Sequence, residues 1–267
     1  ADELRALGFE GSGVKVGVIS DGVDNRAAAQ GTNDLPASIT IQTFAGSGDE
    51  GTAMLEIVHD LAPGAELGFC GLPTRTSLEM IQCVNDLSGV YEADIIVDDL
   101  GFFAEPYFED GPVAQAVADA VDSGVVYASA AGNSAQDHYQ GDFVGTTVLD
   151  LGAPEHNFGN AAGGPSDPNM DITVLPGQSA VILQWNDPFG GSGNNYDLLI
   201  LNETETSILG ASEDIQDGDD NPIEGLPITK PGFSPIKFKV VVIKTGGADR
   251  LLKIFLIGAV RIEQFAV

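Results

Sequence analysis

The chain has 267 residues, of which 43% are hydrophobic, so it can bury a sizeable core and is not a disordered protein. Its 40 acidic residues against 11 basic ones give a formal net charge of −29, and such a surface repels nucleic acid and anionic membranes. No stretch approaches the roughly 20 apolar residues of a membrane-spanning helix. We therefore expect neither a nucleic acid nor a membrane as partner.

Strand and helix signals alternate along the first half of the chain. β-Branched apolar runs predict strands, and apolar residues at helical spacing predict helices between them. The expected strands are 14–20, 38–44, 66–70, 93–97 and 125–131, and the expected helices are 51–61, 77–87 and 112–123. Strands that are apolar throughout and are joined by helices indicate a parallel sheet covered on both faces.

Polar side chains follow the predicted parallel strands at their carboxyl ends, where such sheets bind their ligands. These side chains are Ser20, Asp21, Asp98, Asp99 and Asn133. Their position makes them candidates for a functional site.

The pattern changes after about residue 148, where helical periodicity ends and Gly, Asn, Asp and Pro clusters separate short apolar runs. The runs 171–175, 180–185, 196–201, 236–244 and 251–258 predict strands. An antiparallel sandwich or jelly roll is expected. The predicted domains are thus an α/β core over 1–147 and a β-sandwich module over 148–267.

Three segments resemble, in order, motifs of the subtilisin-like serine peptidases. VKVGVISDGVD resembles the strand that ends in the catalytic aspartate, EGTAMLEIV followed by LAPGAEL resembles the helix opened by the catalytic histidine, and VVYASAAGN resembles the strand that ends in the oxyanion-hole asparagine. Together they cover about residues 8–135. The later module resembles the pre-peptidase C-terminal type, inserted before the serine motif of the family.

The chain departs from the family pattern at three places. Glu50 occupies the histidine position, as in the related sedolisins, but Met54 stands where those enzymes carry a second acid. Strict alignment puts Ser20 at the aspartate position with Asp21 one place later, and Asp99 is a rival partner for Glu50. The Gly-Thr-Ser motif that carries the family's nucleophile does not occur in this chain.

The resemblance implies the N-terminal portion of a secreted serine-type endopeptidase, with this chain alone incomplete and inactive. Glu50 would be the general base, Asp21 or Asp99 its partner, and Asn133 the oxyanion donor. A later or separate segment would supply the serine, and an extended polypeptide substrate would lie along residues 100–103. The aromatic side chains that are candidates to contact it, although each also suits a core, are Phe102, Phe103 and Tyr107. The chemistry requires no cofactor, and a carboxylate base predicts activity that peaks at acidic pH.

Simpler interpretations stand beside these. Asp21 and Asn133 suit turns, and Glu50 suits the first turn of a helix, where the helix dipole stabilises an acid. A catalytically inactive relative that acts as a binding or adhesion module through its β-sandwich would keep the same motifs. Gly46–Gly51 also fits a dinucleotide-binding pattern, but it follows the second strand and places two carboxylates where a pyrophosphate would lie.

Two further features stay open at this level. Oxygen-donor clusters at 214–221 and 186–197 offer either a structural calcium site or solvated acidic loops. Cys70 and Cys83 form either a disulfide or two free thiols of the core.

Overall fold

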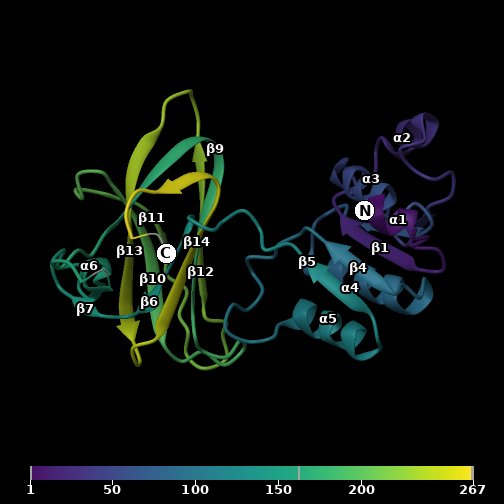
Figure 1. Cartoon of the computed structure of the whole chain (residues 1–267). Helices are drawn as coiled ribbons and strands as arrows, with labels where there is room; N and C mark the ends of the chain where they lie inside the picture. Colours follow the sequence, from purple (N-terminus) through teal and green to yellow (C-terminus); the bar gives the residue numbers. More distant parts are fainter. Residues whose placement is uncertain (1, 162, 266–267) are drawn as a thin grey trace. The chain divides into compact units, whose positions relative to one another are not determined.

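The computed structural model describes residues 2–161 and 163–265 and contains two compact units (Figure 1). The first comprises the chain up to Glu105 together with Asp110–Gly132, and the second comprises Pro106–Glu109 together with the chain from Asn133 onward. The main division therefore falls between Gly132 and Asn133, whereas the change in sequence pattern is near residue 148. None of the described helices is long and apolar enough to cross a membrane.

The first unit contains a five-stranded parallel sheet with strand order β2-β3-β1-β4-β5. Its strands are β1 (Lys15–Ser20), β2 (Thr40–Ile41), β3 (Glu66–Gly71), β4 (Ile95–Asp98) and β5 (Val126–Ser129). Its helices are α1 (Asp2–Ala6), α2 (Arg26–Thr32), α3 (Glu50–Leu61), α4 (Ser77–Asn85), the π-helical turn η1 (Asp86–Val90) and α5 (Pro112–Asp122). The predicted parallel α/β architecture is confirmed.

Alternation along β1 gives this sheet two apolar faces. Val16 and Val18 pack in a core with Leu55 of α3, whereas Ile19 belongs to a second core with Met80 of α4 and Ala116 of α5. Successive side chains of a strand point to opposite faces, so a strand that is apolar throughout must be covered on both. The two cores pack against opposite faces of the sheet. Because the strands are parallel, their carboxyl ends lie at one edge of the sheet.

A disulfide joins Cys70 of β3 to Cys83 of α4, which settles the open question about these two residues. Both cysteines are completely buried. The bridge closes a loop with a sequence separation of 13 residues and fixes α4 to the end of β3.

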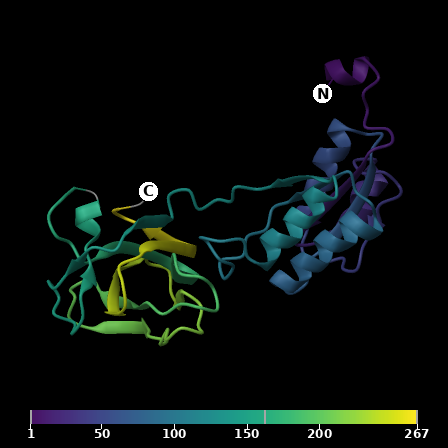
Figure 2. The same ribbon diagram turned by 90° about the horizontal axis from the view of Figure 1, so that it is seen from below.

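The second unit is built from antiparallel strands, apart from the short helix α6 (Phe158–Ala161) (Figure 2). The main path of its nine-stranded sheet runs β11-β10-β13-β9-β14-β6, with β12 paired to β9, β8 to β13 and β7 to β8. The strands are β6 (His138–Asp142), β7 (Gly145–Thr146), β8 (Glu155–His156), β9 (Met170–Trp185), β10 (Asn195–Asn202), β11 (Ile208–Ser212), β12 (Ile223–Lys230), β13 (Ile236–Gly246) and β14 (Leu251–Ile262). An antiparallel β-rich second half, as the sequence predicts, is confirmed.

Removal of the disulfide tests how strongly the first unit depends on it. A Cys70→Ala/Cys83→Ala double variant should lose roughly 2–4 kcal/mol of unfolding free energy, because its unfolded chain regains the entropy of an open loop. Chemical denaturation followed by circular dichroism measures this loss. An unchanged unfolding midpoint would show that the bridge contributes nothing to the stability of the unit.

Candidate active site

The carboxyl ends of β1 and β4 bring a serine and an aspartate together. β1 ends at the completely buried Ser20, whose hydroxyl donates a 3.1 Å hydrogen bond to Oδ2 of Asp99. Asp99 follows the last residue of β4, and β1 and β4 are hydrogen-bonded neighbours. The parallel pairing thus brings together two side chains that are 79 positions apart.

Asp21 connects the end of β1 to the beginning of α3. Its Oδ1 accepts hydrogen bonds from the main-chain N–H of Gly22 at 2.6 Å and of Glu50 at 3.0 Å. Its Oδ2 forms an ion pair with Nη2 of Arg75 at 3.4 Å. An acid at this position satisfies an N–H of the first helical turn, which has no partner within the helix.

The side chain of Glu50 has Asp99 as its carboxyl partner. The two carboxyl groups lie close enough for each to affect the titration of the other. The charge of Asp99, followed by loss of solvation and the charge of Asp21, raises the pKa of Glu50, whereas Arg75 lowers it. Burial raises the pKa of Asp99.

One oxygen of Asp99 lacks a hydrogen-bond donor in the described part of the chain. Oδ2 of Asp99 accepts from Ser20, but Oδ1 is buried without a hydrogen-bond partner among the donors of the described residues. A proton kept on Glu50, whose pKa is raised, would supply a donor to this carboxyl group. Two carboxyl groups in contact that share one proton titrate as a pair.

Asp98 has hydrogen-bond partners of its own, although it is the neighbour of Asp99 in the sequence. It is 5% exposed, and its Oδ1 accepts from the hydroxyl of Ser129 at 3.0 Å and the N–H of Leu100 at 3.3 Å. Burial raises its pKa. The alternation of side chains at the end of β4 therefore selects Asp99 for the site and gives Asp98 a structural position.

A glycine-rich loop before α3 approaches Asp21 more closely than a side chain would allow. The main-chain N–H of Ser47 donates to the carbonyl oxygen of Asp21 at 2.8 Å. A Cβ atom on Gly46 would overlap that carbonyl group, and one on Gly48 would overlap the carboxylate. Gly48 also has a φ of +125°, which side chains rarely permit. The segment Gly46–Gly51, which fits a dinucleotide-binding pattern, thus packs closely around Asp21 and holds it in place.

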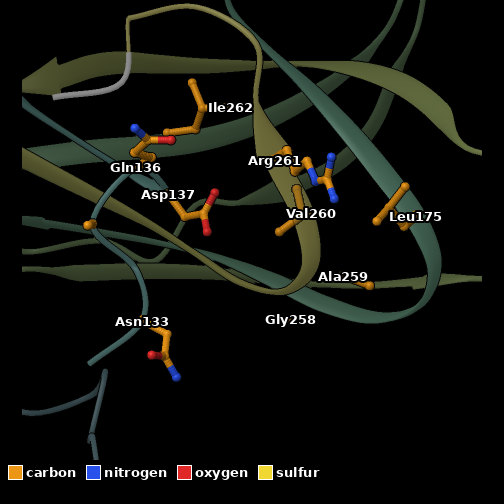
Figure 3. Close-up of a pocket in the computed structure, with 10 residues that line it drawn as sticks. Asn133, Gln136, Asp137, Leu175, Gly258, Ala259, Val260, Arg261 and Ile262 are labelled. Atoms are coloured by element: carbon orange, nitrogen blue, oxygen red, sulfur yellow. The ribbon is translucent and has the colours of Figure 1, made fainter. Parts of the chain in front are cut away.

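Asn133 is the first residue of the second unit and is exposed. It lines an open hollow of about 620 Å³ together with Gln136, Asp137, Arg261 and neighbouring residues of β14 (Figure 3). A bulge at Gly258–Val260 interrupts the pairing of β14 with β9 beside this hollow. The role of Asn133 as an oxyanion donor stays a prediction.

The segment predicted to border the substrate contributes partly to the cores. Leu100 and Phe102 are half-buried and pack against the core shared by α4 and α5. Tyr107 belongs to the second unit, where its ring lies 5.1 Å from that of Phe255. Tyr107 is therefore a packing residue of the β unit.

The two oxygen-rich clusters differ in structure. In the loop before β12, Asp217, Asp219 and Asp220 offer oxygens that all lie within 4.8 Å of one another. In the other cluster, the oxygens of Asp187 accept from Asn194 at 2.7 and 2.8 Å and from Arg250 at 2.5 Å, so N–H donors already surround this carboxylate. A structural calcium ion stays a prediction, and the first cluster suits it better than the second.

Arg75 is the residue that sequence reasoning missed. It lies between β3 and α4, outside the three recognised motifs, and nothing in its local sequence connects it with Asp21. Only the parallel pairing of β1 with β3 brings its segment to this edge. The sequence feature that could have indicated it is its isolation, since Arg75 is the one Lys or Arg between Arg26 and Lys230.

The chain matches no known family model and no curated protein sequence. Among solved structures, the CspB protease of Clostridium perfringens aligns with 98% of this chain and 67% of its own, at 11% identity and a TM-score of 0.56. A carbohydrate-binding module of a Cellvibrio mixtus lichenase aligns with 47% of this chain and 94% of its own, at 12% identity and a TM-score of 0.24, which is too low to support an argument. The chain therefore shares the fold of a clostridial protease.

Substitution of Gly48 tests how the site is assembled. Gly48→Ala should destabilise the protein by roughly 2–4 kcal/mol, because the new methyl group meets the Asp21 carboxylate and the backbone conformation is unfavourable. Gly13→Ala is the matched control, since Gly13 has a φ of +83° but open space around it, and it should cost about 1 kcal/mol. Equal losses in thermal unfolding would contradict a close contact at Asp21.

Proposed function

We propose that this chain is the N-terminal portion of a serine-type endopeptidase and provides the proton-transfer half of its catalytic centre. Glu50 is the general base, Asp99 its carboxyl partner, and Asp21 the residue that holds Glu50 at the strand ends. Asn133 would donate to the oxyanion. The nucleophilic serine would come from a later or separate segment, and the substrate is a polypeptide.

The observation that carries this proposal is the grouping of three carboxyl side chains at the strand ends. Asp21 accepts the N–H of Glu50, Asp99 accepts the hydroxyl of Ser20, and the charges of Asp99 and Asp21 both raise the pKa of Glu50. Carboxylates this close to one another repel unless one of them keeps a proton. A purely structural role would not require such a grouping. This grouping lies at the carboxyl ends of a parallel sheet, where such folds place their ligands. The fold shared with a clostridial protease supports a peptidase but does not identify catalytic residues.

The pair of Glu50 and Asp99 has the chemistry that a hydroxyl nucleophile needs. When the shared proton moves from Glu50 to Asp99, the Glu50 carboxylate can accept the proton of the serine hydroxyl while the serine oxygen attacks the peptide carbonyl. Glu50 then gives this proton to the leaving amine, and water hydrolyses the acyl-enzyme in a second, similar step. Because this base is a carboxylate with a raised pKa, activity is expected in the acidic range.

The buried disulfide supports secretion, since such bridges persist in oxidising compartments. The strongly acidic surface agrees with that location. The antiparallel unit would be a β-sandwich of the pre-peptidase C-terminal type.

The base is tested with the Glu50→Gln variant of the full-length protein. Casein hydrolysis and labelling by a fluorophosphonate probe should both fall roughly a hundredfold or more, because glutamine cannot accept the serine proton. Glu56→Gln is the matched control, since Glu56 lies on the same helix α3 and should retain activity. Mass spectrometry of the labelled peptide identifies the serine.

Two results would count against this function. Full activity in Glu50→Gln would remove Glu50 from the mechanism. A wild-type protein that neither hydrolyses casein nor takes the probe between about pH 3 and pH 8 would support the inactive binding module instead.

A further inference from the structure

The segment between β3 and α4 holds Arg75 in an unusual conformation. Arg75 has a φ of +55°, which is uncommon for a residue other than glycine and is often associated with functional positions. The residues on either side of it are fixed in place, so this conformation is imposed by its surroundings. An arginine here requires an explanation other than local preference.

Glu79 of α4 provides most of this fixation. Its carboxylate accepts hydrogen bonds from the N–H of Thr74 at 3.1 Å, the hydroxyl of Thr74 at 2.7 Å and the N–H of Thr76 at 3.2 Å. Thr76 in turn caps α4 by accepting from the N–H of Glu79. The disulfide between Cys70 of β3 and Cys83 of α4 also ties together the two elements that this segment connects.

The guanidinium group of Arg75 is directed to the candidate active site by this scaffold. It lies 3.4 Å from Oδ2 of Asp21, and its side chain is 63% exposed whereas that of Asp21 is 13% exposed. Because Oδ1 of Asp21 already accepts from the N–H of Glu50, the arginine and the first turn of α3 hold opposite sides of one carboxylate.

Arg75 is also the cation that opposes the acidic groups around Glu50. Asp21 faces Glu50 from the end of β1 and Asp99 from the end of β4, and Asp49 precedes it on its own element. Farther away, Asp24 accepts from the loop that seats Asp21, and Asp98 is buried in β4. Of the groups that shift the pKa of Glu50, Arg75 is the one that lowers it by its charge.

The geometry points to Arg75 as a positioning residue, which holds the Asp21 carboxylate against the first turn of α3 and places a positive charge beside the carboxyl groups of the candidate site. Its importance for catalysis rests on the proposed peptidase function, but its effect on Glu50 does not. Without Arg75, Asp21 would lose its counter-charge, and Glu50, whose pKa this positive charge lowers, would keep its proton to a higher pH. Arg75 thereby favours the ionised form of Glu50, which is the form that acts as a base.

The test is a pH titration of the Glu50 carboxyl signal by carbon-13 NMR in this chain, with the signal assigned from Glu50→Gln. Arg75→Gln should raise the Glu50 midpoint by roughly 0.5–1 pH unit, because a nearby positive charge is removed. Arg75→Lys should restore most of the wild-type midpoint. Arg26→Gln removes a charge from α2 of the same unit and should leave the midpoint unchanged.

Arg75→Gly is a second variant, for the case that Arg75→Gln does not fold. Glycine adopts a positive φ freely, so this variant should be at least as stable as the wild type while its Glu50 midpoint rises as in Arg75→Gln. An unchanged midpoint in Arg75→Gly, or an equal rise in Arg26→Gln, overturns the inference. Since this readout needs no activity, a shifted midpoint together with full activity in Glu50→Gln would refute the peptidase proposal and leave the role of Arg75 intact.

Discussion

The Asp21 carboxylate is the contact on which the candidate site depends. One of its oxygens accepts the N–H of Glu50 and the other pairs with Arg75, so a single side chain joins the end of β1, the beginning of α3 and the segment before α4. These elements are far apart in sequence, and only the parallel sheet brings them together. The glycines of the preceding loop leave the space that this arrangement needs.

The site gathers negative charge in a protein that already carries a net charge of −29. Repulsion between such groups is reduced in two ways, by a cation and by a retained proton. Arg75 provides the cation at Asp21. On the proposed account, Glu50 and Asp99 share the proton. The hydroxyl of Ser20 orients the Asp99 carboxylate from the buried side, so its position does not depend on solvent. Asp187 in the second unit shows the contrasting case, in which N–H donors satisfy a carboxylate completely.

The sequence predicted most of the first unit because its strands are apolar throughout and the end of each is marked by polar residues. It also singled out Asp21, Glu50 and Asp99, and in the structure Asp21 accepts the N–H of Glu50. The choice of carboxyl partner depended on where β4 ends. Pairing over long sequence distances decided the rest. Arg75 reaches the site through a backbone conformation that no local pattern signals.

The second unit was harder to predict, since several of its strands are short, polar or contain proline. The two runs 171–175 and 180–185 form one strand, β9, which continues through Pro176 and Gly177. At Pro176 the strand passes from its pairing with β13 to its pairing with β12, so the missing N–H of proline breaks no ladder there. The strands β6, β11 and β12 were missed because polar residues and glycines interrupt their apolar pattern.

The central claim is that Glu50 and Asp99 hold one proton between them. Neutron diffraction from deuterium-exchanged crystals grown at about pH 5 locates this proton directly, at a pH where an ordinary glutamate is mostly ionised. The account predicts one deuteron between the two carboxyl groups, with the Ser20 deuteron directed at Asp99. Two ionised carboxylates that point apart, with no deuteron between them, would contradict it.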